Sequence, residues 1–122
     1  MIPTEAATQL SEPLEQSEAQ DEIFCPVNGA LDLLTARWTL HIVRALLGGP
    51  RRFNEIAQMY GINAHTLRER LRSLENEAVV TRTVISAMPP NVEYALTEKG
   101  LALNRVFKEL ADWGRVWVKP PQ

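Results

Sequence analysis

Apolar residues recur at helical spacing between Phe53 and Val80, and the repeat is interrupted once, at Gly61. Glycine tolerates the backbone angles of a sharp turn, and we expect Ile62 to pack between the two helices that this turn joins. Asn63 is expected to cap the second helix with its side-chain oxygen. One face of that helix is apolar and the opposite face is polar. The apolar face carries Leu67, Leu71, Leu74 and Ala78, and the polar face carries His65, Arg68, Glu69, Arg72 and Asn76. The pattern predicts a helix-turn-helix.

Two further helices are predicted upstream of this pair. Cys25 stands at the cap position of the first, and Pro26 lies in its first turn, where a missing N–H costs nothing. The second runs from Arg37 to Leu47 and ends at a Gly-Gly-Pro sequence. Its apolar positions are spread widely enough to be buried on more than one side. His41, among apolar neighbours, is expected to be a core histidine rather than a ligand.

Downstream of the helix pair the apolar period changes to two. Val80–Ser86 and Val92–Leu96 are predicted to be strands joined by a proline-containing turn, and a hairpin in this position is a wing. A last helix is predicted from Thr97 to Val118, with Thr97 as its cap. Its apolar residues form one stripe, and we expect a symmetric partner to bury them, with packing against the chain's own core as the alternative. These candidate dimer-interface residues are Leu103, Val106, Phe107, Leu110, Trp113 and Trp117.

The formal net charge is −2, but the charges are unevenly distributed. Residues 1–24 hold six acids and no Lys or Arg, so the remainder has nine acids against thirteen basic residues, a net charge of +4. Seven arginines and four glutamates lie between Arg44 and Arg82, the region of the helix pair. This favours a nucleic-acid partner over an ordinary solvated face. Residues 1–22 are predicted to form an acidic, disordered tail that either competes with DNA for the basic face or only solubilises the chain.

The polar face of the second helix supplies the candidate DNA contacts. Arginine bridges guanine O6 and N7 or clamps a phosphate, which favours Arg68 and Arg72, with surface pairing to neighbouring acids as the alternative. Arg70 is assigned equally to a phosphate contact and to a structural ion pair, and the Arg51-Arg52 pair equally to phosphate contact and to solvation. The full set of candidate DNA-binding residues is Asn63, His65, Thr66, Arg68, Glu69, Arg70, Arg72, Arg51 and Arg52.

Composition narrows the remaining classes of function. The apolar and charged fractions, 45% and 23%, are typical of one soluble domain, which we place at residues 23–118. One cysteine excludes an intramolecular disulfide, and two histidines without nearby ligands predict no metal site and no cofactor. The sequence shows neither a membrane span nor a signal peptide, so a cytoplasmic location is expected. It also lacks a catalytic constellation or a glycine-rich phosphate loop, and we expect no enzyme activity.

The chain from about Cys25 to Trp117 resembles the HxlR-type winged-helix transcriptional regulators, which are relatives of the MarR group. The similarity rests on an ordered set of segments: Cys25-Pro26-Val27, Arg37-Trp38-Thr39, Arg52-Phe53-Asn54-Glu55-Ile56, Leu67 to Glu75, and Pro89 to Gly100. It implies an α+β, mostly α fold, a winged helix-turn-helix with N-terminal and C-terminal dimerisation helices. It also implies a homodimer whose two recognition helices enter successive major grooves of an inverted-repeat operator. The wing departs from the family, because uncharged Asn91 stands where a basic residue is frequent.

The resemblance also concerns Cys25. Several regulators similar to this one use a cysteine in this place to sense oxidants, quinones or other electrophiles, and an intersubunit disulfide is one outcome. The positive end of the helix dipole favours a reactive thiolate, whereas Asp21 and Glu22 oppose it; a small buried apolar residue is the alternative. The resemblance implies a homodimeric, sequence-specific transcriptional regulator that acts as a repressor or, less often, as an activator, and it makes Cys25 a candidate sensor of oxidants or electrophiles. The alternative function is a winged-helix protein-interaction module without specific DNA binding.

Overall fold

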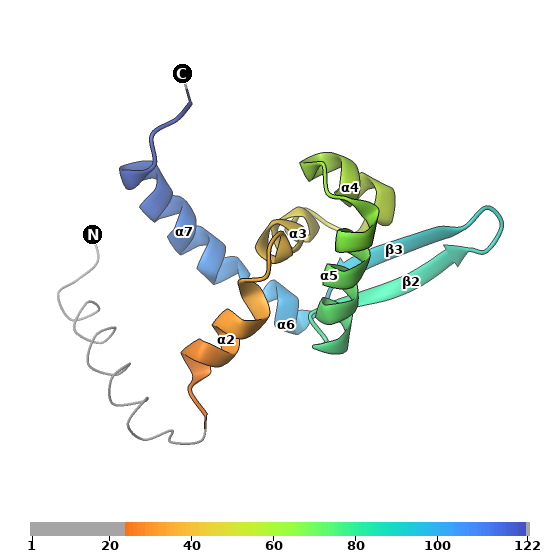
Figure 1. Cartoon of the computed structure of the whole chain (residues 1–122), viewed down its shortest axis with the longest axis horizontal. Helices are drawn as coiled ribbons and strands as arrows, with labels where there is room; N and C mark the ends of the chain where they lie inside the picture. Colours follow the sequence, from red (N-terminus) through yellow and green to blue (C-terminus); the bar gives the residue numbers. More distant parts are fainter. Residues whose placement is uncertain (1–23, 122) are drawn as a thin grey trace. The chain divides into compact units, whose positions relative to one another are not determined.

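The computed structural model describes residues 24–121, and the chain divides into two compact units between Ala36 and Arg37. The predicted acidic tail, residues 1–22, lies outside the described residues. In the first unit the described element is α2 (Pro26–Leu34), and the second unit holds the remaining helices and the sheet (Figure 1). The boundaries predicted for a single domain, residues 23–118, stay a prediction.

Helix α2 begins as the Cys-Pro sequence predicts. Cys25 is the N-cap residue, with an extended backbone, and Pro26 takes the first helical position. The Cys25 carbonyl oxygen accepts the N–H of Gly29 at 2.9 Å, which closes the first turn. At the other end the Thr35 hydroxyl donates to the Leu31 carbonyl at 2.6 Å. No residue of α2 is buried, and Leu31 is 49% exposed, so this helix presents apolar surface.

The second unit places its helices around a small sheet. Its elements are α3 (Thr39–Leu47), β1 (Arg51–Arg52), α4 (Phe53–Tyr60), α5 (Ala64–Asn76), β2 (Val80–Ser86), β3 (Asn91–Leu96), α6 (Glu98–Leu101) and α7 (Asn104–Trp117). Figure 1 shows α5 beside the base of the long β2–β3 hairpin. The core collects residues from α3, α4, α5 and the start of β2: Ile42, Val43, Leu46, Ile56, Leu67, Leu71, Leu74, Val79 and Val80.

The three-stranded antiparallel sheet has the order β1-β3-β2. The wing is confirmed: β2 and β3 pair from Val80 opposite Leu96 onward, with an irregularity near the turn. The third strand, β1, was not expected, because two residues are too short to show an alternating pattern. It pairs Arg51 with Tyr94 and so ties the start of α4 to the wing.

The turn of the helix-turn-helix is confirmed, but its second helix is shorter than predicted. Gly61 has φ +66°, and Ile62 is 6% exposed between the helices. Helix α5 ends at Asn76, so the assignment of Ala78 to its apolar face is wrong. Ala78 is exposed with φ +60°, and its carbonyl accepts the Thr97 hydroxyl at 2.6 Å. This left-handed turn directs Val79 and the first residue of β2 into the core.

The start and the exposed side of α3 also differ from the prediction. The helix begins at Thr39, and Trp38, half-buried, precedes it with φ +75°. His41 is exposed rather than in the core, because Ile42 and Val43 take the buried face. Its ring instead packs edge-on against Trp38, with centroids 5.1 Å apart, and against Tyr60 at 5.2 Å.

The predicted terminal helix is two helices, α6 and α7, separated at Ala102 and Leu103. Thr97 caps the first as expected, accepting the Gly100 N–H at 3.2 Å. Gly100 is buried against the Val79 carbonyl and the Leu96 side chain, which holds α6 on the end of the wing. The Leu103 N–H donates to the Gly100 carbonyl three residues back at 3.1 Å, and this tight turn ends α6 before α7 begins.

Replacing Gly100 by Ala is expected to lower the free energy of unfolding by about 1–3 kcal/mol. A Cβ at this position would clash with the Val79 carbonyl oxygen and lie 2.8 Å from Leu96 Cδ2. Chemical denaturation of both proteins measures the difference. Ala102→Ser, at an exposed position just after α6, is the control and should change stability little. Equal stability of Gly100→Ala and the wild type would contradict this packing.

Candidate nucleic-acid interface

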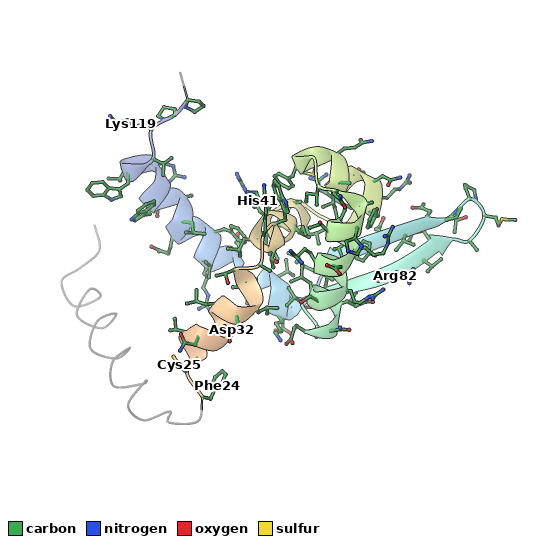
Figure 2. The ribbon with its side chains drawn as sticks, in the orientation of Figure 1. Phe24, Cys25, Asp32, His41, Arg82 and Lys119 are labelled. Atoms are coloured by element: carbon green, nitrogen blue, oxygen red, sulfur yellow. The ribbon has the colours of Figure 1, made fainter. Side chains whose placement is uncertain are left out.

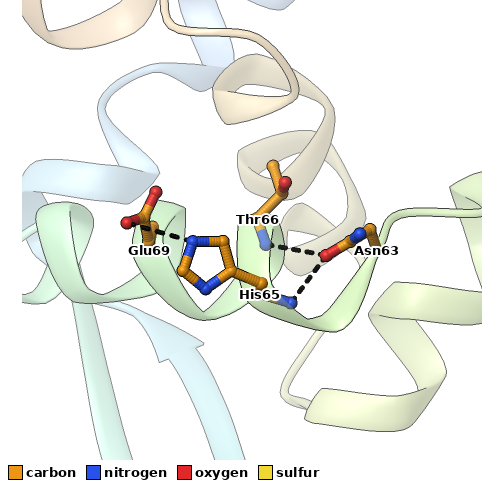
Figure 3. Close-up of polar contacts among 4 residues, drawn as sticks. All are labelled: Asn63, His65, Thr66 and Glu69. Carbon is orange, nitrogen blue, oxygen red and sulfur yellow. Dashed lines mark hydrogen bonds and ion pairs between the residues drawn. The ribbon is translucent and has the colours of Figure 1, made fainter.

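The first turn of α5 is organised by Asn63. Its backbone is extended, and its side-chain Oδ1 accepts the N–H groups of His65 at 2.8 Å and Thr66 at 3.2 Å (Figure 3). Two of the N–H groups that every helix leaves unpaired at its start are thereby satisfied without help from another element. The predicted cap is confirmed, and the side chains of this turn are left at the protein surface.

The polar face of α5 is exposed as the sequence predicted. Leu67, Leu71 and Leu74 are buried, which turns Arg68, Glu69 and the rest of the opposite face outward. His65 Nε2 lies 3.4 Å from Glu69 Oε1, one helical turn along, with both side chains exposed (Figure 3). Such an exposed contact contributes little to stability, so both side chains can exchange it for another partner.

The Arg70 side chain makes a contact within the fold. Its Nε donates to the carbonyl oxygen of Arg37 at 2.7 Å, and the side chain is half-buried. The hydrogen bond joins α5 to the segment before α3, where Trp38 holds its left-handed backbone. Of the two roles predicted for Arg70, the geometry favours the structural one, although its partner is a carbonyl and not an acid.

The two arginines before α4 differ in their contacts. Arg51 Nε donates to the Ala45 carbonyl at 2.9 Å and is half-buried, which fixes the start of β1 on the end of α3. Arg52 is exposed, and its backbone N–H donates to the Glu55 carboxylate at 2.9 Å. Arg52 therefore offers a guanidinium group to solvent, while Arg51 is partly used within the fold.

A cleft of about 450 Å³ separates α5 from the wing. Arg68 and Arg72 of α5 line it, and the Arg68 guanidinium carbon lies 5.7 Å from the centre of the Phe53 ring. The wing contributes Arg82, a residue absent from the sequence-based set (Figure 2). Strand alternation could have identified it, because Arg82 shares the helix-facing side of β2 with Val80. The remaining lining residues are Glu75, Val92 and Tyr94.

Among residues 24–121 the apolar stripe of α7 is largely uncovered. Trp113 and Trp117 are 59% and 70% exposed, and Val106 and Leu110 are also exposed. Leu103 and Phe107 are half-buried. A groove of about 900 Å³ lies between α3 and the same part of α7. Within residues 24–121 the two tryptophans do not pack into the core, and the symmetric partner stays a prediction.

Neither a membrane span nor a metal site appears in residues 24–121. None of the helices described there is long and apolar enough to cross a membrane. Over the same residues, His, Cys, Asp and Glu side chains form no cluster of three that could hold a metal ion.

Comparison with known proteins identifies relatives along most of the chain. A family model described as HxlR-like helix-turn-helix matches residues 33–122. The uncharacterized HTH-type transcriptional regulator YvaP of Bacillus subtilis is 43% identical over 99 residues, covering 80% of this chain and 92% of YvaP. The HTH-type transcriptional regulator YodB of the same organism is 41% identical over 99 residues, covering 80% of this chain and 88% of YodB.

Solved structures agree with the sequence comparison. The reduced form of YodB superposes with a TM-score of 0.68 at 39% identity, covering 82% of this chain and 100% of YodB; YodB is also known in a quinone-bound form. The redox regulator HypR in its oxidized form gives a TM-score of 0.71 at 33% identity, covering 79% of this chain and 100% of HypR. These similarities confirm the winged helix-turn-helix fold.

Asn63→Ala is expected to lower the free energy of unfolding by about 1 kcal/mol, because two N–H groups of α5 would lose their acceptor. Asn63→Asp keeps a side-chain oxygen in place and should retain most of the wild-type stability. Urea denaturation followed by circular dichroism compares the three proteins. An alanine variant as stable as the wild type would show that water caps α5 equally well.

Proposed function

We propose that this chain, which belongs to the HxlR-like helix-turn-helix family of transcriptional regulators, binds an inverted-repeat operator as a homodimer and represses transcription by occluding a promoter. The observation that carries this proposal is α5: its leucines are buried, its start is capped by Asn63, and its polar face is open to a DNA groove. Membership in this family makes the chain a DNA-binding transcriptional regulator.

Within this proposal some side chains of α5 contact the DNA bases and others contact the phosphate backbone. Arg68 and Arg72 are exposed and able to reach guanine edges or phosphates. His65, Thr66 and Glu69 lie on the first two turns, where a recognition helix meets bases, and the contact between His65 and Glu69 opens when DNA binds. The exposed Arg52 side chain contacts phosphate before α4, with Arg51 and Arg70 holding the elements in place.

The homodimer is proposed from the uncovered face of α7. Two exposed tryptophans on one stripe with Val106 and Leu110 form an apolar surface of the kind that marks protein interfaces. A symmetric partner would cover this stripe with its own, since a two-fold interface places the same patch on both subunits. Two recognition helices would then be held at a fixed spacing, which an inverted-repeat operator requires.

The proposed effector is an oxidant or an electrophile such as a quinone, acting on Cys25. The chain's one cysteine lies at the N-cap of α2, half-buried, immediately before Pro26 (Figure 2). Its relatives include YodB, known in quinone-bound form, and the redox regulator HypR. A thiolate here would add to an electrophilic carbon of a quinone, or join the same residue of the second subunit in a disulfide when an oxidant accepts two electrons. Either product would alter the spacing of the recognition helices.

Fluorescence anisotropy on DNA from upstream of the chain's own gene tests the regulator proposal. The reduced protein is expected to bind tightly, with affinity falling linearly on a log–log plot against salt concentration. Arg72→Ala should weaken binding roughly tenfold, because it removes one charged contact from each half-site. Treatment with a quinone or with diamide should release the wild type but not Cys25→Ser.

The controls separate the parts of this experiment. A random duplex of equal length measures non-specific binding, and Asn104→Ala, at the start of α7, tests a substitution outside the α5 surface. Equal affinity of the reduced protein for the two duplexes would exclude autoregulation. If no genomic fragment competes for the protein better than the random duplex does, specific DNA binding would be overturned. Release of Cys25→Ser by diamide would overturn the role of Cys25 alone.

Light scattering after size-exclusion chromatography tests the homodimer. The wild type should elute at twice the mass of the chain, and Trp113→Glu should be monomeric, because the interface cannot bury an unpaired carboxylate. Arg105→Glu, on the opposite side of α7 from the apolar stripe, should stay dimeric. Circular dichroism verifies that both variants are folded. A monomeric wild type, or a dimeric and folded Trp113→Glu, would contradict the proposed interface.

A further inference from the structure

We propose that the cleft between α5 and the wing binds a phosphate of the DNA backbone, and that Arg82 is a DNA-contacting residue at this site. The inference rests on the proposed DNA-binding function and adds to it a second, sequence-independent contact beside the recognition helix. The wing would then act through the base of its hairpin rather than through its tip.

The geometry of the wing brings Arg82 to α5. Arg82 pairs across the hairpin with Tyr94, and both residues line the cleft. Successive side chains of a strand point to opposite faces, so Arg82 shares its face with Val80, which is buried under the helices. The guanidinium group is therefore on the side of the wing that faces Arg68 and Arg72, and all three line one cavity of about 450 Å³.

The charges of the cleft favour an anion. Three arginines and one carboxylate, Glu75, line it. Among residues 24–121 the contacts between basic and acidic side chains are His65–Glu69 and Asp112–Arg115, so none of the three arginines is neutralised by a salt bridge. Arg68 is instead held over the Phe53 ring. Like charges gathered in a cleft raise its affinity for an anion, and guanidinium groups match phosphate oxygens in pairs.

The position of the cleft favours a contact with the DNA backbone over a contact with the bases. When α5 lies in a major groove, the sugar-phosphate strands border it on both sides, so a side chain from an element beside the helix reaches phosphate first. Arg82 is the one basic residue from Val80 to Leu96, and the tip of the hairpin, Ala87 to Asn91, carries no charge. The one positive charge of the wing is therefore at its base, and the one acid of the wing, Glu93, lies opposite Thr83.

Arg82→Gln tests the inference against Lys119→Gln, which removes the same charge beyond the end of α7. Arg82→Gln should bind roughly tenfold more weakly both to the promoter fragment, which is the DNA from upstream of the chain's own gene, and to a random duplex. Lys119→Gln should bind both DNAs like the wild type. The slope of log affinity against log salt should become shallower by about 0.9 for each phosphate lost. The preference for the promoter fragment should not change, since phosphate contacts carry no sequence information.

Two further measurements exclude an indirect effect of misfolding. Glu75→Gln removes the one carboxylate from the cleft and should strengthen binding severalfold, a direction that a damaged fold would not give. Duplexes with single methylphosphonate substitutions neutralise one phosphate at a time. The wild type should lose affinity at one position in each half-site, and Arg82→Gln should be insensitive at that same position, which assigns the bound phosphate to DNA.

The outcomes distinguish this inference from the proposed function. If the wild type binds DNA and Arg82→Gln keeps both its affinity and its salt slope, the phosphate site is overturned while the regulator function stands. The same holds if methylphosphonate sensitivity is equal in the two proteins. If the wild type itself shows no salt-dependent DNA binding, the proposed function fails first.

Discussion

The burial of three leucines of α5 is the constraint on which the rest of the second unit depends. Leu67, Leu71 and Leu74 are almost inaccessible, and they lie four and three residues apart, so the helix has one rotation about its axis that buries all three. That rotation points the polar face outward. It also places α5 beside β2, whose first residue, Val80, is buried in the same core. Exposure of the recognition surface is thus a consequence of core packing.

Polar contacts fix the first turn of α5, its middle and the residues just beyond its end. The side chain of Asn63 satisfies its first turn, and Arg70 joins its middle to the Arg37 carbonyl. Beyond its end, Thr97 donates to the carbonyl of Ala78. Hydrogen bonds of this kind are individually worth about 1 kcal/mol, but each is directional. A helix held at both ends and at its middle keeps its side chains in register with a groove, which sequence-specific reading requires.

The fold was predictable where periodicity extended over several turns or strand residues, and less so where single residues decide. The spacing of apolar residues predicted the helix pair and the wing. The residue types predicted the cap positions at Cys25, Asn63 and Thr97. Strand β1 and the division between α6 and α7 could not be predicted, since two residues define the strand and one tight turn at Ala102-Leu103 separates the helices. His41 was misplaced because apolar neighbours along the chain say little about which face of α3 is buried.

The candidate site shows the same limit. Spacing along α5 identified Arg68 and Arg72, but Arg82 enters the site through strand register, ten residues further along the chain and on another element. Net charge was equally uninformative: a chain at −2 still carries three arginines in one cleft, and six of its fifteen acids lie before residue 25, where no Lys or Arg occurs. Local charge density, set by which elements the core brings together, governs attraction to a phosphate backbone. A hairpin with a neutral tip can therefore still contribute to DNA binding, provided that its base adjoins the recognition helix.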